Sequence, residues 1–333
     1  MAVNDIIKES DYNAIRNKLV SVMGTGSADY GWGQDSKILS SAVAVGSKVS
    51  MNDWGKLRYD IINAYVHLYG TTPTTVQTAE GDRIRYTGTF TPDTGALDSP
   101  VYQYNRWVDT IVANRFLLGS GQSIDTVDVT TVRHYNMSTL GTYWTTSISC
   151  EIKIEFASAN DARYFFNSGS TIRITSSRAT ATVNAQNTAW TSLLSSAGTR
   201  SFGGNTPGTG TTPANGTNWY RLGNADQAWY TLSSSSPYGS NSYKLYGRCD
   251  VANNSTGTAK IGYFVVQFND GYVDPDVRSG HPDLSHPPGD RVDGSFNVVV
   301  DCLYPSGIFV PTGTGNFTIT PPTVTFSQTI TGS

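Results

Sequence analysis

The chain has 333 residues, a formal net charge of −3 and a charged fraction of 15%, well below the roughly 25% of ordinary soluble domains. Its 23 basic and 26 acidic residues nearly balance, which argues against nucleic acid as a partner because phosphate binding requires a basic surface. No apolar run approaches the ~20 residues that cross a bilayer, and the polar start MAVNDIIKESDYN does not resemble a signal peptide. We therefore expect a soluble protein without membrane insertion that is not exported by the usual route.

Residues 1–70 predict a small helical docking module. Ser10 is a suitable N-cap for a first amphipathic helix, which Gly24 ends. Ser50, followed three residues later by Asp53, predicts the start of a second helix that Gly70 ends. Four aromatic residues of this module form the candidate docking interface: Tyr12, Trp32, Trp54 and Tyr65.

Residues 71–122 predict a linker followed by a connecting helix. The stretch GTTPTTVQTAEGD is rich in turn-forming residues and lacks periodicity. Ser99 as N-cap and Pro100 at the first helical position predict a third helix that runs to about Leu118.

Residues 123–333 predict a mainly β domain. From Thr146 to Phe156 apolar and polar residues alternate, which is typical of a strand with one buried and one wet face. Similar patterns predict strands at Tyr243–Val251, Lys260–Phe268, Ser295–Leu303 and Thr323–Thr331. The fold class we expect is α+β: a small N-terminal helical module followed by a mainly antiparallel, sandwich-like β region with short inserted helices.

Two short helices are predicted inside the β region. Ser158 caps ANDARYFFN, with Asp161 at the third helical position and Gly169 as the stop. The second, TAWTSLLSSAG, begins at Asn187 or Thr188.

The sequence predicts no catalytic, cofactor-binding or metal-binding residues. The glycine-rich stretch from Gly24 to Gly33 follows a helix and lacks the lysine of a phosphate loop. Two histidines and several acids between Asp270 and Gly294 suit a divalent ion, but the prolines there favour a stiff exposed loop. The three cysteines, Cys150, Cys249 and Cys302, are odd in number and lie in apolar contexts, so we expect buried free thiols.

Aromatic residues gather in the middle of the β region. Exposed aromatics stack on sugar rings or anchor protein interfaces, whereas buried ones fill a core. The sequence leaves both interpretations open for the candidate surface-aromatic contact, which comprises Trp190, Trp219, Tyr220, Trp229 and Tyr238.

Three separated motifs resemble virion structural proteins of tailed phages, notably myoviruses that infect marine cyanobacteria. A recurrent N-terminal module of those proteins is similar to the stretch ESDYNAIRNKLVSVMGTGSADYGWGQ of this chain, which is followed by SKVSMNDWGKLRYDIINAYVHLYG. The stretch EIKIEFASANDARYFFNSGSTIRI resembles their strand–helix–strand core, and GYFVVQFNDGYVD with DGSFNVVVDCLYPSG resembles their end. This chain has Trp32 where tyrosine is usual and Gly169-Ser170 in place of two glycines.

The resemblance implies a non-enzymatic virion component of the tail, neck or fibre, assembled in the host cytoplasm. Its expected partners are other virion proteins and copies of itself in a trimer or sixfold ring. Binding of a host-surface receptor or glycan, a role as a capsid decoration protein and polysaccharide depolymerase activity are the alternatives. A depolymerase would need two carboxyl groups some ~5 to 10 Å apart in a cleft.

Overall fold

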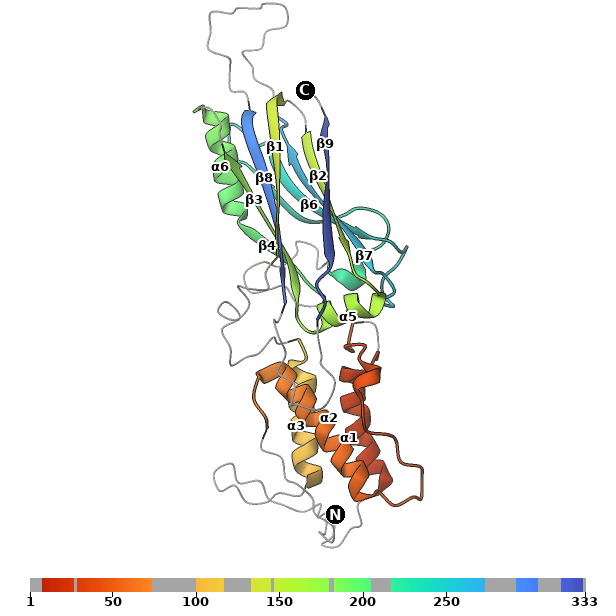
Figure 1. Cartoon of the computed structure of the whole chain (residues 1–333). Helices are drawn as coiled ribbons and strands as arrows, with labels where there is room; N and C mark the ends of the chain where they lie inside the picture. The colour runs from red at the N-terminus through yellow and green to blue at the C-terminus, as the bar shows by residue number, and fades with distance from the viewer. Residues whose placement is uncertain are drawn as a thin grey trace, which may run out of the picture. The chain divides into compact units, whose positions relative to one another are not determined.

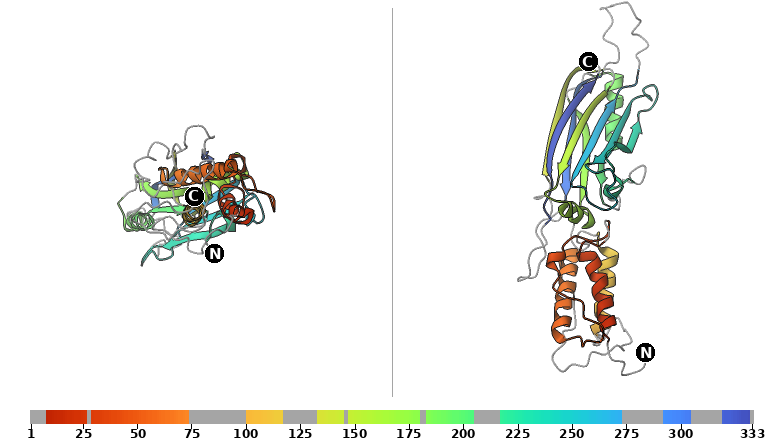
Figure 2. Two further views of the ribbon diagram at one scale, coloured as in Figure 1. Left: turned by 90° about the horizontal axis from the view of Figure 1, so that it is seen from below. Right: turned by 90° about the vertical axis from the view of Figure 1, so that its right-hand side faces the viewer.

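The computed structural model divides the chain into two compact units, each built from separate stretches of sequence (Figures 1 and 2). The helical unit comprises Met1–Thr131, Arg163–Ser170 and Tyr304–Thr320, and the β unit comprises Val132–Ala162, Thr171–Leu303 and Pro321–Ser333. The structure describes residues 8–26, 29–73, 100–116, 133–144, 147–179, 183–204, 217–272, 292–304 and 319–331.

The helical unit contains three helices in the described part of residues 1–131: α1 (Glu9–Met23), α2 (Met51–Tyr69) and α3 (Pro100–Asn114). Helix α2 begins and ends as predicted, because the Ser50 hydroxyl accepts from the Asp53 N–H and Gly70 takes the left-handed conformation that closes a helix. Helix α1 begins at Glu9, slightly before the predicted cap at Ser10. No helix among the described residues has the length and apolarity that a membrane span requires.

The three helices run in the same direction. Tyr12 in the first turns of α1 lies 5.3 Å from Trp54 in the first turn of α2, and Trp54 lies 5.6 Å from Tyr104 near the start of α3 (ring centroids). Parallel neighbours require the chain to return along the bundle between helices. The return segment after α1, residues 38–45, follows the 3-10 helix Asp35–Lys37.

Side chains of α1 and α2 hold the return segment by its backbone. The amide of Asn13 both donates to the Val43 carbonyl (2.8 Å) and accepts from the Val43 N–H (3.0 Å), as a neighbouring strand would. The buried carboxylate of Asp60 accepts from the N–H groups of Leu39 (2.9 Å) and Ser40 (2.8 Å). These bonds satisfy backbone groups that form no sheet or helix.

The helical unit extends beyond the predicted module of residues 1–70. Val101, Tyr104, Val108 and Ile111 of α3 are buried, so α3 completes the core and is not the connecting helix expected for residues 71–122. Arg163–Ser170 also belongs to this unit, although the predicted β domain of residues 123–333 contains it. The expected division into three consecutive segments is therefore wrong.

The described residues of the β unit form two antiparallel sheets. The first has the order β1-β8-β3-β4 and the second the order β5-β6-β7-β2-β9. The strands of the first sheet are β1 (Arg133–Trp144), β3 (Thr171–Ala179), β4 (Thr199–Phe202) and β8 (Val292–Leu303). Those of the second are β2 (Ser147–Glu155), β5 (Gln227–Ser233), β6 (Ser242–Cys249), β7 (Ile261–Asn269) and β9 (Thr323–Thr331).

The two sheets pack face to face. The Ser176 hydroxyl on β3 lies 2.9 Å from the Tyr243 hydroxyl on β6, and the rings of Phe268 on β7 and Phe296 on β8 are 4.5 Å apart. Helix α6 (Ala185–Ala197) runs beside β3 (Figure 1). The ring of its Trp190 packs against both phenylalanines. The α+β fold with a mainly antiparallel, sandwich-like β region is confirmed.

The short elements also follow the sequence closely. Helix α5 (Ala159–Asn167) covers the predicted ANDARYFFN, and Ser158 accepts from the Asp161 N–H. Helix α6 begins before the predicted Asn187, because the side chain of Asn184 caps it. A further 3-10 helix, η3 (Trp219–Arg221), was not predicted.

We predict that Asp60→Ala lowers the free energy of unfolding of the helical unit by about 2 kcal/mol, because the buried N–H of Ser40 and the partly buried N–H of Leu39 lose their acceptor. Hydrogen exchange of the α1 and α2 amides measures this change. Asp109→Ala is the matched control: it breaks an exposed ion pair with Lys18 and should cost less than about 1 kcal/mol. Equal losses in both variants would contradict the role of Asp60.

Candidate functional site

The best-defined polar arrangement of the helical unit surrounds Trp32. The indole N–H of Trp32 donates to the carbonyls of Asn167 (3.1 Å) and Arg115 (3.2 Å). We call Trp32, His67, Arg163, Tyr164 and Asn167 the Trp32 cluster. All five side chains are buried.

Two hydrogen bonds connect side chains of α5 to the backbone of the turn after α1. The side-chain amide of Asn167 donates to the Gly31 carbonyl (2.7 Å), and the guanidinium of Arg163 donates to the Thr25 carbonyl (2.7 Å). Gly31 is required there, since an added Cβ would lie 2.1 Å from the Gly24 carbonyl oxygen. Residues more than 130 positions apart are thereby fixed to one another.

His67 contributes an aromatic face to the cluster. Its ring lies edge-on to Trp32 with a centroid distance of 4.6 Å and is tilted against Tyr164 at 5.7 Å. Burial lowers the pKa of His67 to about 4, so the ring is neutral at physiological pH. Burial also raises the pKa of Tyr164 well above its usual value.

The Trp32 cluster is suited to holding backbone segments together. The hydrogen bonds described above run from side-chain donors to backbone carbonyls, and the rings of His67 and Tyr164 are held in their neutral forms. General acid–base chemistry requires a titratable group near pH 7 that a substrate can reach, and His67 and Tyr164 meet neither condition. The arrangement therefore fixes shape.

The predicted docking interface is largely wrong. Tyr12, Trp32 and Trp54 are at most 1% exposed, because Trp54 packs against Tyr12 and against Tyr104 of α3 while Trp32 packs against His67. Tyr65 is partly exposed and packs against Tyr69 and Trp107. The aromatic stripes of the first 70 residues build a core, and their burial depended on a third helix that the prediction had assigned elsewhere.

The predicted surface-aromatic contact is also wrong. Its five members are buried in the β unit: Trp190, Trp219, Tyr220, Trp229 and Tyr238. Trp219 lies against Phe156, and Trp229 lies against Phe202. These rings fill the interior of the sandwich, which the sequence had left as the alternative.

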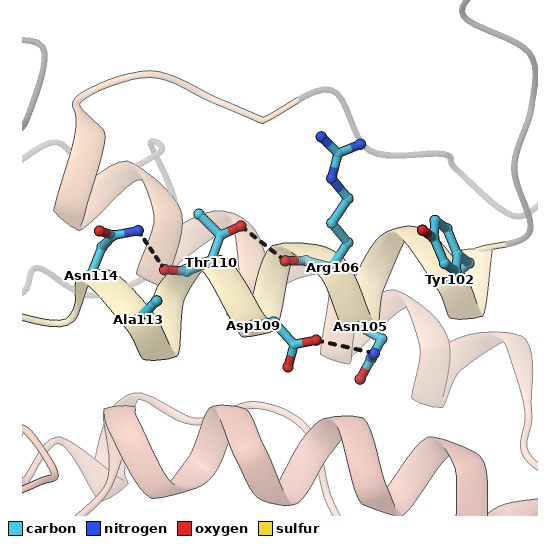
Figure 3. Close-up of a pocket in the computed structure, with 7 residues that line it drawn as sticks. All are labelled: Tyr102, Asn105, Arg106, Asp109, Thr110, Ala113 and Asn114. Atoms are coloured by element: carbon cyan, nitrogen blue, oxygen red, sulfur yellow. Dashed lines mark hydrogen bonds between the residues drawn. The ribbon is translucent and has the colours of Figure 1, made fainter. Parts of the chain in front are cut away.

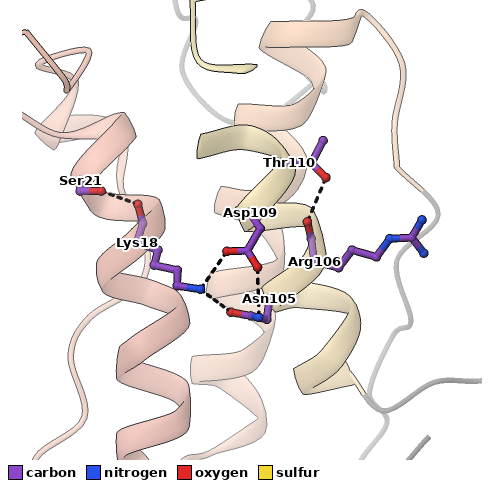
Figure 4. Close-up of polar contacts among 6 residues, drawn as sticks. All are labelled: Lys18, Ser21, Asn105, Arg106, Asp109 and Thr110. Carbon is purple, nitrogen blue, oxygen red and sulfur yellow. Dashed lines mark hydrogen bonds and ion pairs between the residues drawn. The ribbon is translucent and has the colours of Figure 1, made fainter. Parts of the chain in front are cut away.

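A shallow pocket of about 420 Å³ lies along α3 (Figure 3). Its lining residues are Tyr102, Asn105, Arg106, Asp109, Thr110, Ala113 and Asn114. The ammonium of Lys18 on α1 contacts Asp109 (2.8 Å) and Asn105 (3.0 Å), so its charge is balanced there (Figure 4). The Thr110 hydroxyl and the Asn114 amide bond to carbonyls of their own helix. These bonds position α3 and present no converging reactive groups.

Most of the predicted ion loop, Asp270–Gly294, lies outside the described residues, including His281 and His286. Asp270 itself accepts from the Gln186 amide (2.8 Å), and burial raises its pKa to about 6. No group of three potential metal ligands occurs in the described part of the chain.

The three cysteines are buried free thiols, as predicted. Burial raises the pKa of Cys150 to about 12 and also raises that of Cys249. A thiol with so high a pKa carries almost no thiolate at neutral pH and is a poor nucleophile.

Sequence reasoning missed the roles of His67, Arg163 and Asn167. Asn167 is the last residue of the predicted helix ANDARYFFN, and the prediction assigned it no other role. The sequence alone does not indicate a structural role for a histidine near the end of a helix or for an arginine in a short helix, because the partners of both residues lie far away in sequence.

Comparison of the chain with protein-family models, with curated proteins and with solved structures finds no match. The resemblance to phage virion proteins therefore depends on the quoted motifs alone.

We predict that the helical unit loses stability as the pH falls from about 6.5 to about 4. The folded pKa of His67 lies below its unfolded value, so the unfolded chain binds the extra proton in this window. This group's contribution is fully present above pH 6.5, and its loss amounts to about 3 kcal/mol by pH 4. Denaturation of the wild type and of His67→Phe at several pH values measures the difference, and an identical pH dependence would contradict the assignment.

We further predict that Asn167→Ala destabilises the helical unit by about 2 kcal/mol, because the buried Gly31 carbonyl loses its donor. Asn105→Ala on the exposed face of α3 is the matched control, with an expected change of about 0.5 kcal/mol or less. Faster amide exchange in α1 for Asn167→Ala alone is the expected result. Similar exchange in both variants would show that the Asn167 bond contributes little.

Proposed function

We propose that this protein is a non-enzymatic structural component of a tailed-phage virion, in the tail, neck or fibre. It acts by binding other virion proteins and copies of itself, and it is assembled into particles in the host cytoplasm.

One observation carries the proposal. Two of the three motifs that carry the resemblance meet in the Trp32 cluster: the N-terminal motif, residues 9–34 and 47–70, and the strand–helix–strand motif, residues 151–174. Residues 9–34 supply Trp32 and the acceptor carbonyls, residues 47–70 supply His67, and residues 151–174 supply the donors Arg163 and Asn167. The motif residues that resemble phage proteins are thus used to fix a shape.

Fixed shape is the property that an assembly protein needs. A rigid partner loses little conformational entropy when it binds, so more of its contact energy appears as affinity. Catalytic sites, by contrast, place titratable or nucleophilic groups where substrate reaches them.

The alternatives receive less support from the described residues. Binding of a host receptor or glycan was suggested by aromatics that are buried. For a depolymerase, Glu151 is ion-paired with Arg248 and Glu155 with Lys153 on a sheet face, so both carboxylates already have cationic partners. A capsid decoration role differs from the proposal only in the site that the copies occupy.

The proposal predicts that density-purified particles of the phage encoding this chain contain it in a fixed stoichiometry. Quantitative mass spectrometry of banded particles gives the copy number, and gold-labelled antibody against the recombinant protein locates the copies by electron microscopy. Labelling of the tail, neck or fibre supports the proposal, whereas labelling of the capsid shell would support decoration. Presence of the protein only in the lysate would contradict a virion role.

A further inference from the structure

Strand β9 forms one edge of the second sheet in the described part of the chain. This strand pairs with β2 over its full length, Thr323–Thr331, without a bulge. It stands at the end of the strand order, and within the described residues it pairs with no other strand. Strand β1 of the other sheet comes near it but shares no ladder with it (Figure 1).

The other three sheet edges are interrupted or short. Strand β5 carries an irregularity between Ala228 and Tyr230, and β1 carries one between Gly141 and Trp144. Strand β4 has only four residues. Irregular or very short edge strands prevent a sheet edge from pairing with another chain. Strand β9 has neither a bulge nor a proline, and none of its residues is charged.

The sequence of β9, TVTFSQTIT, is nearly a palindrome in residue class about Ser327. Moving outward from Ser327, Phe326 corresponds to Gln328, Thr325 to Thr329, Val324 to Ile330, and Thr323 to Thr331. Only the innermost pair departs from the symmetry. A strand that pairs antiparallel with a copy of itself brings each residue opposite its palindromic counterpart, so this pattern suits self-pairing.

We propose that β9 pairs antiparallel with β9 of a second copy of this chain, about a twofold axis at Ser327. The pairing places threonine opposite threonine and valine opposite isoleucine, which are favourable cross-strand pairs, and brings no like charges together. Thr323, Thr325 and Ser327 are exposed, and Phe326 is only partly buried. The two five-stranded sheets then continue into one another across the axis.

The proposal specifies how copies associate and to that extent rests on the proposed function. Its symmetry is twofold, unlike the trimer or sixfold ring that the resemblance implies. An isologous contact of this kind uses the same surface on both copies and closes on itself, which limits the product to a pair.

The first test is charge substitution at the axis. Ser327→Lys and Ser327→Glu each place two like charges opposite one another, and each should weaken dimerisation of the full chain at least about tenfold in sedimentation velocity. An equimolar mixture of the two variants should restore dimers, because unlike charges then face each other. Ser233→Lys adds the same charge to the opposite edge of the same sheet and should dimerise like the wild type.

The second test is a covalent report of register. Ser327→Cys should form an intermolecular disulfide under mild oxidation, since the twofold axis brings Ser327 next to its counterpart. The three native cysteines are buried, so they provide a low background. Ser233→Cys is the control and should remain uncrosslinked.

Two results would overturn the pairing: a wild-type chain that is monomeric throughout the concentration range, or a dimer that neither Ser327→Lys nor Ser327→Glu weakens. Both are measured on the purified chain, so they are independent of the particle assay. Absence from particles with intact dimers would refute the virion role alone, and monomers in solution with normal incorporation would refute the β9 pairing alone.

Discussion

The helical unit depends on hydrogen bonds to main-chain carbonyls that the protein has removed from water. An indole N–H or an amide buried without an acceptor is costly, so the carbonyls that meet Trp32 and Asn167 offset the cost of burying them. Those carbonyls belong to Gly31, Arg115 and Asn167, which are distant in sequence. The hydrogen bonds to these carbonyls determine where the end of α5 lies within the helical unit. His67 and Tyr164 then pack around a backbone arrangement that is already specified.

Local sequence signals predicted most of the elements but not their partners. Ser50, Asp53 and Gly70 define α2 because capping depends on residues within a few positions. Alternation predicted β2 and β9 because one wet and one buried face produce a period of two. The membership of α3 and of Arg163–Ser170 in the helical core could not be predicted, since it depends on contacts between residues that no local pattern connects.

The candidate sites failed for a related reason. A tryptophan has the same identity in a core as on a surface, and its exposure depends on which segment covers it. Trp219 sits on a 3-10 helix in a stretch without periodicity, so no stripe indicated that it faces Phe156. The buried free thiols could be predicted because Cys150 alternates with polar neighbours along a clear strand.

The discontinuous make-up of the helical unit has a consequence for the order of folding during synthesis. The first three helices emerge from the ribosome early, but Arg163–Ser170 follows later, and Tyr304, whose ring centroid lies 6.4 Å from that of Phe165, later still. Contacts of such long sequence separation are slow to form, because the intervening chain must close a large loop. The unit that is translated first is therefore completed last, after nearly all of the β sandwich has been made. A nascent chain that stops short of Tyr304 cannot present the finished helical surface to a partner.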